Sequence, residues 1–163
     1  MPNLGIDLGG TKIEAVLLND DGKTIERKRV PTISSDGYEA IVNRITNLVN
    51  ELLPLAEGIN HIGICTPGAI DLKKGVLKNS NTICLIGKPL QKDLENQIGL
   101  SVFMENDANC FALAEASFGA AQAYNVVFGV IMGTGIGGGI VFNKQIHNGP
   151  NNIAGEWGHH ALY

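Results

Sequence analysis

The first candidate for chemistry is a glycine turn near the amino terminus. Gly9 and Gly10 follow an apolar run that contains Asp7, and Thr11 and Lys12 come directly after them. Glycine lets backbone N–H groups approach phosphate oxygens closely, and a hydroxyl and a positive charge stand beside these two. Asp7 is placed to hold a magnesium-bound water near the same phosphates. The alternative is an ordinary hairpin turn, although such turns favour Asn-Gly or Asp-Gly.

A second glycine-rich segment, residues 133–139, follows another apolar run. Its candidate phosphate-binding residues are Gly133, Thr134, Gly135, Gly137 and Gly138. Their spacing matches the dinucleotide-binding fingerprint, but that fingerprint needs a helix after its last glycine, and residues 140–142 are typical of a strand. The first turn nearly matches the P-loop, except that Thr11 and Lys12 stand in the reverse order and a strand follows. We therefore predict two strand–turn–strand phosphate clamps.

A third candidate lies at a strand-to-helix junction, where Asn106 and Asp107 stand between an apolar run and a stretch of small residues. An Asp in such a place takes the proton from a substrate hydroxyl in phosphoryl transfer, and Asn106 could bind a neighbouring hydroxyl. The alternative is a helix N-cap, the commonest role for Asp or Asn at a helix start. The two readings are compatible, because a residue near a helix start still has a carboxylate oxygen to offer.

The last candidates are Glu156 and His159, three residues apart. On a helical turn they would share a face, and such a pair can bind a polyol or a metal. The alternative is an exposed turn with incidental charges. We assign no role to His160.

The elements that must position these residues alternate between strands and helices. Short apolar runs bounded by turn residues predict strands, and a helical spacing of apolar residues that Pro54 ends predicts the first helix. Strands are expected over residues 3–8, 13–18, 24–30, 59–65, 101–105, 126–132 and 140–142, and a strand or a hairpin over 70–77. Helices are expected from the segment 34–37 to residue 52, over 90–98, and from Asn106 to Gly119. This order predicts an α/β fold whose mixed sheet opens with a three-strand antiparallel meander.

Charge and hydropathy exclude several classes of protein. The net charge is −4, without a basic run, which disfavours tight binding to nucleic acid. No apolar run approaches the ~18 residues that span a bilayer, and the amino terminus lacks a signal-peptide pattern. Hence we expect no membrane partner.

The three cysteines, Cys65, Cys84 and Cys110, are widely spaced among apolar neighbours. They are typical of reduced core thiols in a cytoplasmic protein, and without a close pair they do not build a zinc site.

Glycine is over-represented, at 21 of 163 residues against a usual ~7%.

Taken in order, five motifs resemble those of one family, the ROK family of bacterial sugar kinases. They are Asp7-x-Gly9-Gly10-Thr11-Lys12, Cys65-Thr66-Pro67-Gly68, Glu105-Asn106-Asp107-Ala108-Asn109, Gly133-Thr134-Gly135-x-Gly137-Gly138-Gly139 and Gly155-Glu156-x-Gly158-His159. The resemblance implies an actin-like ATPase (ribonuclease-H-like) fold, with a complete small lobe over 1–119 and the start of a large lobe over 120–163. The segment 75–81, together with 154–159, most resembles the fructokinase and mannokinase branch.

The resemblance also implies roles for single residues. The two glycine segments would bind ATP, with Mg²⁺ near Asp7, and Asp107 would be the base that activates a hexose hydroxyl. Sugar hydroxyls would be bound by Asn81, Asn106, Asp107, Glu156 and His159. In the family this histidine also ligates a structural Zn²⁺ with cysteines of a later motif that the present sequence lacks. Members are longer and usually homodimeric, so the chain alone is expected to have little or no kinase activity.

Three rival functions stay open. One is N-acetylglucosamine kinase activity within the same family. A second is a sugar-responsive repressor, which would need a helix-turn-helix segment before Asp7 and a basic surface. The third is a non-catalytic sugar- or nucleotide-binding module.

Overall fold

The computed structural model describes residues 2–132 and 135–158, and the chain divides into two compact units, Met1–Glu105 and Asn106–Tyr163. Each unit is described by itself. The division falls before the third long helix, whereas the expected boundary lay after it, at Gly119. The main contacts of that helix are with the strands that follow it in the chain.

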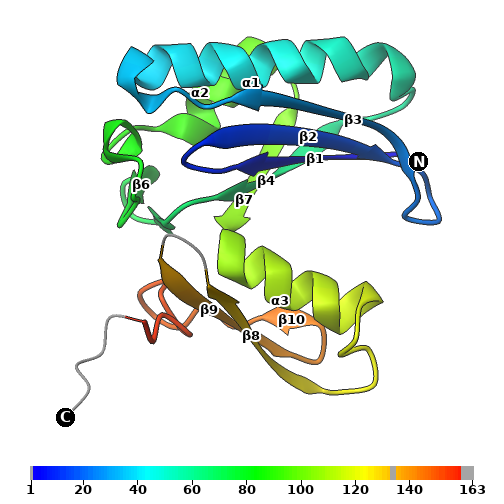
Figure 1. Cartoon of the computed structure of the whole chain (residues 1–163), viewed down its shortest axis with the longest axis vertical. Coiled ribbons are helices and arrows are strands. Elements are labelled where there is room, and N and C mark those ends of the chain that lie inside the picture. Colours follow the sequence, from blue (N-terminus) through cyan, green and yellow to red (C-terminus); the bar gives the residue numbers. More distant parts are fainter. Residues whose placement is uncertain (1, 133–134, 159–163) are drawn as a thin grey trace. The chain divides into compact units, whose positions relative to one another are not determined.

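The first unit is built on a mixed five-stranded sheet (Figure 1). Its strands are β1 (Asn3–Leu8), β2 (Lys12–Leu18), β3 (Thr24–Pro31), β4 (His61–Thr66) and β7 (Ser101–Asn106), in the order β3-β2-β1-β4-β7. β1 and β2 are antiparallel, as are β2 and β3, while β4 runs parallel to β1. The predicted meander and the switch to parallel pairing are both present.

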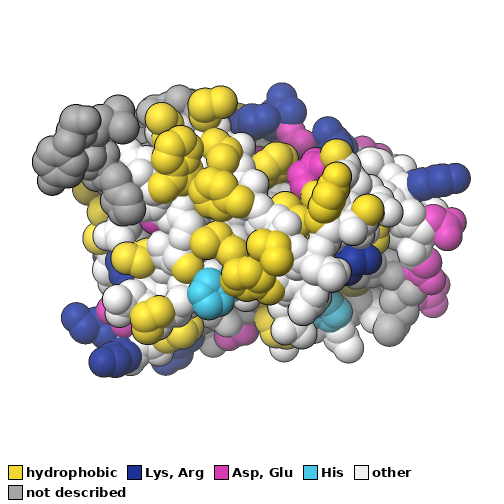
Figure 2. Space-filling model, turned by 90° about the horizontal axis from the view of Figure 1, so that it is seen from below, with side chains coloured by type: hydrophobic (Ala, Val, Ile, Leu, Met, Phe, Trp, Pro, Cys, Tyr) yellow, Lys and Arg dark blue, Asp and Glu magenta, His cyan; other side chains and the backbone are white. Residues whose placement is uncertain are grey.

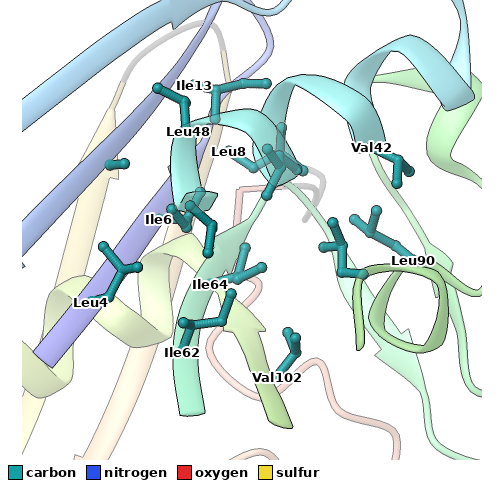
Figure 3. Close-up of a cluster of buried hydrophobic side chains, with 14 of the residues drawn as sticks. Leu4, Ile6, Leu8, Ile13, Val42, Leu48, Ile62, Ile64, Leu90 and Val102 are labelled. Carbon is teal, nitrogen blue, oxygen red and sulfur yellow. The ribbon is translucent and has the colours of Figure 1, made fainter. Parts of the chain in front are cut away.

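Two helices supply the other half of this unit's core. They are α1 (Tyr38–Leu52) and α2 (Leu90–Ile98), and they pack against each other. In β1, every second side chain is buried, so Leu4, Ile6 and Leu8 all enter one core (Figure 3). Each such side chain contributes about 1.5–3 kcal/mol through burial.

Short elements connect these strands and helices. They are η1 (Ser34–Asp36), η2 (Leu53–Leu55), β5 (Ala69–Asp71), β6 (Val76–Lys78) and η3 (Ile83–Leu85). β5 and β6 pair as the hairpin that was one of the two possibilities for residues 70–77. The segment expected to start the first helix forms the short η1 turn, and α1 begins only at Tyr38.

The second unit contains α3 (Asp107–Phe118) and an antiparallel sheet of order β10-β9-β8. The strands are β8 (Val126–Met132), β9 (Ile136–Phe142) and β10 (Gln145–Ile146). β9 begins earlier than the predicted strand over 140–142. The sequence did not indicate this start, because the glycines 137–139 carry no side chains whose alternation would predict a strand. β10 was not predicted.

One face of β8 packs against α3 and the other remains exposed. Val127 joins Ala112, Ala116 and Val141 in a small core. The alternate side chains of β8 are all apolar and exposed: Val126, Phe128, Val130 and Met132. Figure 2 shows the gathering of hydrophobic side chains on a face of the molecule. In the described part of the chain, no helix is long and apolar enough to cross a membrane.

Candidate functional site

The first glycine turn closes the hairpin between β1 and β2. Gly9 N–H donates to the Lys12 carbonyl at 2.9 Å, which joins the two ends of the turn. A Cβ on Gly9 would lie 3.0 Å from that carbonyl oxygen, tighter than nearly all real Cβ contacts, so the turn favours glycine. The N–H groups of Gly10 and Thr11 donate no hydrogen bond to any residue that the structure describes. These two N–H groups are therefore available to an anion.

Lys12 provides a positive charge at this turn. The Lys12 side chain is 46% exposed, and its Nζ lies 3.9 Å from a Glu14 carboxylate oxygen. Glu14 is bound more closely by Arg29, whose Nε donates at 2.6 Å, and Arg27 lies 3.4 Å away. The hydrogen bond from Arg29 is the main cause that lowers the pKa of Glu14, against a smaller opposing effect of desolvation. Lys12 is thus only loosely held and keeps its charge available.

Asp7 lies in β1 opposite Glu14 in β2 and Cys65 in β4. Desolvation raises the pKa of Asp7, the charge of Lys12 opposes this rise, and that of Glu14 adds to it. Among the described residues there is no group of three or more His, Cys, Asp or Glu side chains that could hold a metal. A single carboxylate suits Mg²⁺, which keeps several waters and takes further ligands from substrate phosphates. It does not suit zinc, and we assign no step to that metal.

A second loop of the first unit lies beside the glycine turn. A Cβ on Gly10 would be 3.7 Å from Thr82 Oγ1, so the segment after β6 reaches the turn. Asn81 is exposed, between the buried Ser80 and Thr82, and Ser80 Oγ accepts a hydrogen bond from Thr82 N–H at 3.1 Å. The structure therefore brings Asn81 near the predicted phosphate turn, which the sequence did not indicate.

Gly68 holds the base of this loop. Its φ is +110°, and a Cβ there would lie 2.6 Å from the Lys78 carbonyl oxygen. Glycine is required on both counts. Thr66, at the end of β4, is fully buried and donates from Oγ1 to the Glu105 carbonyl at 3.3 Å. The end of β4 is thereby tied to the end of β7, directly before the predicted catalytic Asp107.

Asn106 is the N-cap of α3. Its Oδ1 accepts hydrogen bonds from the N–H groups of Ala108 at 2.9 Å and Asn109 at 3.3 Å. Asp107 is the first helical residue, partly exposed, and its Oδ1 accepts from Ala108 N–H at 2.8 Å. The capping alternative thus holds for Asn106, and its role with substrate stays a prediction. Asp107, one residue later, keeps a partly exposed carboxylate at the helix start.

The second glycine segment differs from a simple loop. Gly133 and Thr134 lie outside the described residues, and Gly135 forms a bend. Gly137 and Gly138 lie within β9, where Gly138 packs so closely against the segment after β10 that a Cβ would lie 2.6 Å from the Gly155 carbonyl oxygen. Packing alone therefore requires glycine at position 138. Its role with nucleotide stays a prediction.

The described residues of the segment 149–158 form turns and irregular backbone, with no helix among them. Glu156 is partly buried, and its N–H donates to the Ile153 carbonyl at 3.2 Å. Asn148, directly before this segment, is bound to α3, because Asn109 donates from Nδ2 to Asn148 Oδ1 at 2.9 Å. His159 lies outside the described residues.

An antiparallel meander continued by a parallel strand, with helices against the sheet, defines the class of protein. It is the ribonuclease-H-like fold of actin-like ATPases, which the solved ROK sugar kinases share. The family model described as "ROK family" matches residues 3–163, and the chain belongs to this family.

Relatives and solved structures that resemble the chain include named sugar kinases. The N-acetyl-D-glucosamine kinase of Haemophilus influenzae is 41% identical over 97% of the chain and 52% of its own length. That of Vibrio parahaemolyticus is 42% identical over the same shares. Among structures, a Streptomyces griseus glucokinase in complex with glucose and AMPPNP is 33% identical, with a TM-score of 0.87 over 100% of the chain and 51% of its own. The chain spans about half the length of the curated relatives it matches.

Proposed function

We propose that this chain forms the nucleotide-binding and base-bearing part of an ATP-dependent hexose kinase. The observation that carries the proposal is the glycine turn: two backbone N–H groups without an acceptor among the described residues stand next to the loosely held Lys12. Convergent N–H donors and a cation are what a nucleotide phosphate requires. The kinase names of relatives at 41–42% identity agree with this assignment.

In the proposed reaction, the glycine turn and Lys12 bind ATP phosphates. Mg²⁺, held through water by Asp7, would neutralise charge on those phosphates. The Asp107 carboxylate takes the proton of the acceptor hydroxyl, whose oxygen then attacks the γ-phosphorus while ADP leaves. Sugar hydroxyls are bound by Asn81, Glu156 and His159, with the Asn106 amide beside the base. A base of this kind contributes about 10²–10⁴-fold to the rate.

The acceptor is a hexose. Relatives that are 41–42% identical are named N-acetyl-D-glucosamine kinases, which favours that sugar over fructose, mannose or glucose. The resemblance of segments 75–81 and 154–159 to the fructokinase and mannokinase branch favours fructose or mannose instead. A panel of the four sugars decides between them.

Three further proposals come from the family resemblance alone. The whole protein is a cytoplasmic homodimer, and His159 is a zinc ligand together with cysteines of a later segment. Because the chain spans about half of its curated relatives, residues 1–163 alone are expected to show little turnover.

Binding and turnover test the proposal separately. Calorimetry of residues 1–163 with AMPPNP tests nucleotide binding. For turnover, the chain is joined to the carboxyl-terminal half of the Haemophilus influenzae kinase, and ADP release is measured with each sugar. Asp107→Asn is expected to lower kcat at least ~100-fold with the sugar affinity kept. Asp21→Asn, in the exposed β2–β3 turn, is the matched control. A folded chimera without turnover on any sugar, or an Asp107→Asn chimera with full turnover, contradicts the proposal.

A further inference from the structure

Thr32 is a buried polar residue that no step of the proposed reaction uses. It follows β3 directly and is fully buried. Its N–H donates to the Thr11 carbonyl at 2.9 Å, and its Oγ1 donates to the Gly9 carbonyl at 2.7 Å. Thr32 thus binds two carbonyl groups of the glycine turn, although it lies more than 20 residues after them in the chain.

The hydroxyl bond fixes the direction of a neighbouring donor. The peptide between Gly9 and Gly10 is planar and trans, so its C=O and N–H point in opposite directions. With the Gly9 carbonyl held toward Thr32, the Gly10 N–H points away from Thr32. That N–H is one of the two without an acceptor among the described residues. Without the Thr32 hydroxyl, the peptide between Gly9 and Gly10 can turn over, because glycine tolerates the backbone angles of either orientation of the peptide plane.

Thr32 is itself held from behind. Arg44 on α1 donates from Nη1 to the Thr32 carbonyl at 2.9 Å, and its other terminal nitrogen binds the Asp36 carboxylate. The next residue, Ile33, has a φ of 45°, a left-handed conformation that is costly for a β-branched side chain. The contacts on both sides of Ile33 thus outweigh this local cost.

We propose that Thr32 is a positioning residue that, supported by Arg44, orients the Gly10 N–H for nucleotide phosphate. The proposal rests on the proposed function, since it concerns the same turn. Thr32 touches no reacting atom and acts through the Gly9–Gly10 peptide.

Three variants of residues 1–163 separate orientation from stability. Thr32→Val removes the hydroxyl and keeps the shape, and Thr32→Ser keeps the hydroxyl. Thr46→Val is the matched control: Thr46 is also a buried threonine of this unit, and its Oγ1 donates at 2.9 Å to Gln97 between α1 and α2. For each variant, AMPPNP affinity is measured by calorimetry, and amide exchange at Gly9 and Thr32 by NMR in the absence of nucleotide.

Thr32→Val is expected to weaken AMPPNP binding about tenfold, equivalent to about 1.4 kcal/mol. It is also expected to speed exchange at Gly9, whereas Thr32→Ser and Thr46→Val stay within about twofold of the wild type in affinity. If Thr32→Val does not fold, Arg44→Met tests the same network from its outer end and is expected to weaken binding as well.

Two negative results are distinguishable. Wild-type affinity and exchange in Thr32→Val, or wild-type affinity in a folded Arg44→Met where Thr32→Val fails to fold, overturn the role of Thr32 alone. Failure of the folded wild-type chain to bind AMPPNP overturns the proposed function, and the role of Thr32 with it.

Discussion

Gly139 in β9 lies directly against the backbone of Ala108 in the first turn of α3. A Cβ on Gly139 would come closer than 3.0 Å to the Ala108 carbonyl oxygen and carbon. This approach places the start of α3, and with it Asp107, tight against the sheet of the second unit. The glycine therefore serves helix–sheet packing, whatever the nearby segment binds.

Gly139→Ala is expected to destabilise the second unit by about 1–3 kcal/mol, because the backbone it meets cannot move aside like a flexible side chain. Urea unfolding followed by circular dichroism measures the loss. The control is Gly63→Ala in β4, where nothing lies within 4 Å of the added Cβ. Equal stability of the two variants would contradict this account of Gly139.

Asn106→Ala is expected to destabilise α3 by about 1 kcal/mol, because the cap of Ala108 and Asn109 N–H groups is lost. Asn106→Asp keeps a capping oxygen and is expected to stay near wild-type stability. Thermal unfolding of the two variants measures the difference. If alanine and aspartate behaved alike, the cap would not be the stabilising contact.

Lys12→Met is expected to weaken AMPPNP binding about tenfold, since a charge-assisted contact of 1.5–3 kcal/mol is removed while the apolar stem stays. The loss should shrink at high salt, which screens the exposed charge in the wild type. Lys23→Met, exposed in the β2–β3 turn, is the control and should bind as the wild type does. Calorimetry at low and high salt provides the measurement, and salt-independent affinity in the wild type would count against a phosphate contact by Lys12.

The Glu14 carboxylate predicts a pH dependence of stability. Its pKa is lowered chiefly by the hydrogen bond from Arg29, so the folded state favours the charged form. A lowered pKa stabilises the fold above the pKa of the unfolded chain, and this contribution is lost as pH falls through the folded value. Wild type and Glu14→Gln should therefore differ in unfolding free energy at neutral pH and converge in acid. Urea titrations from pH 7 downward check this, and a difference that grew in acid would refute it.

Local pattern was enough to predict most of the fold. The helical spacing from Ile41 to Leu52 and the short apolar runs bounded by turn residues each indicate one element type, so α1 and the meander were predicted correctly. The start of β9 was missed because its glycines show no alternation. Whether Glu156 and His159 share a face stays a prediction, because His159 lies outside the described residues.

For the candidate site too, the sequence indicated some residues and not others. The residue types at Gly9, Gly10, Lys12 and Asp107 predicted phosphoryl-transfer chemistry, because few other functions need those groups in that order. Nothing in the sequence indicated Thr32, which is an ordinary threonine after a strand until the fold places its hydroxyl on the Gly9 carbonyl.

The sequence by itself determined the family, the order of the longer strands and helices, and the groups available for chemistry. These depend on residue type and short-range periodicity, which a linear chain displays openly. Only the tertiary structure decided which glycines are needed for packing, that Asn106 caps α3, and that Thr32 and Thr82 reach the first glycine turn. Apart from the local cap, these relationships join residues far apart in the chain, and such backbone approaches and buried hydrogen bonds arise only once the strands and helices have packed.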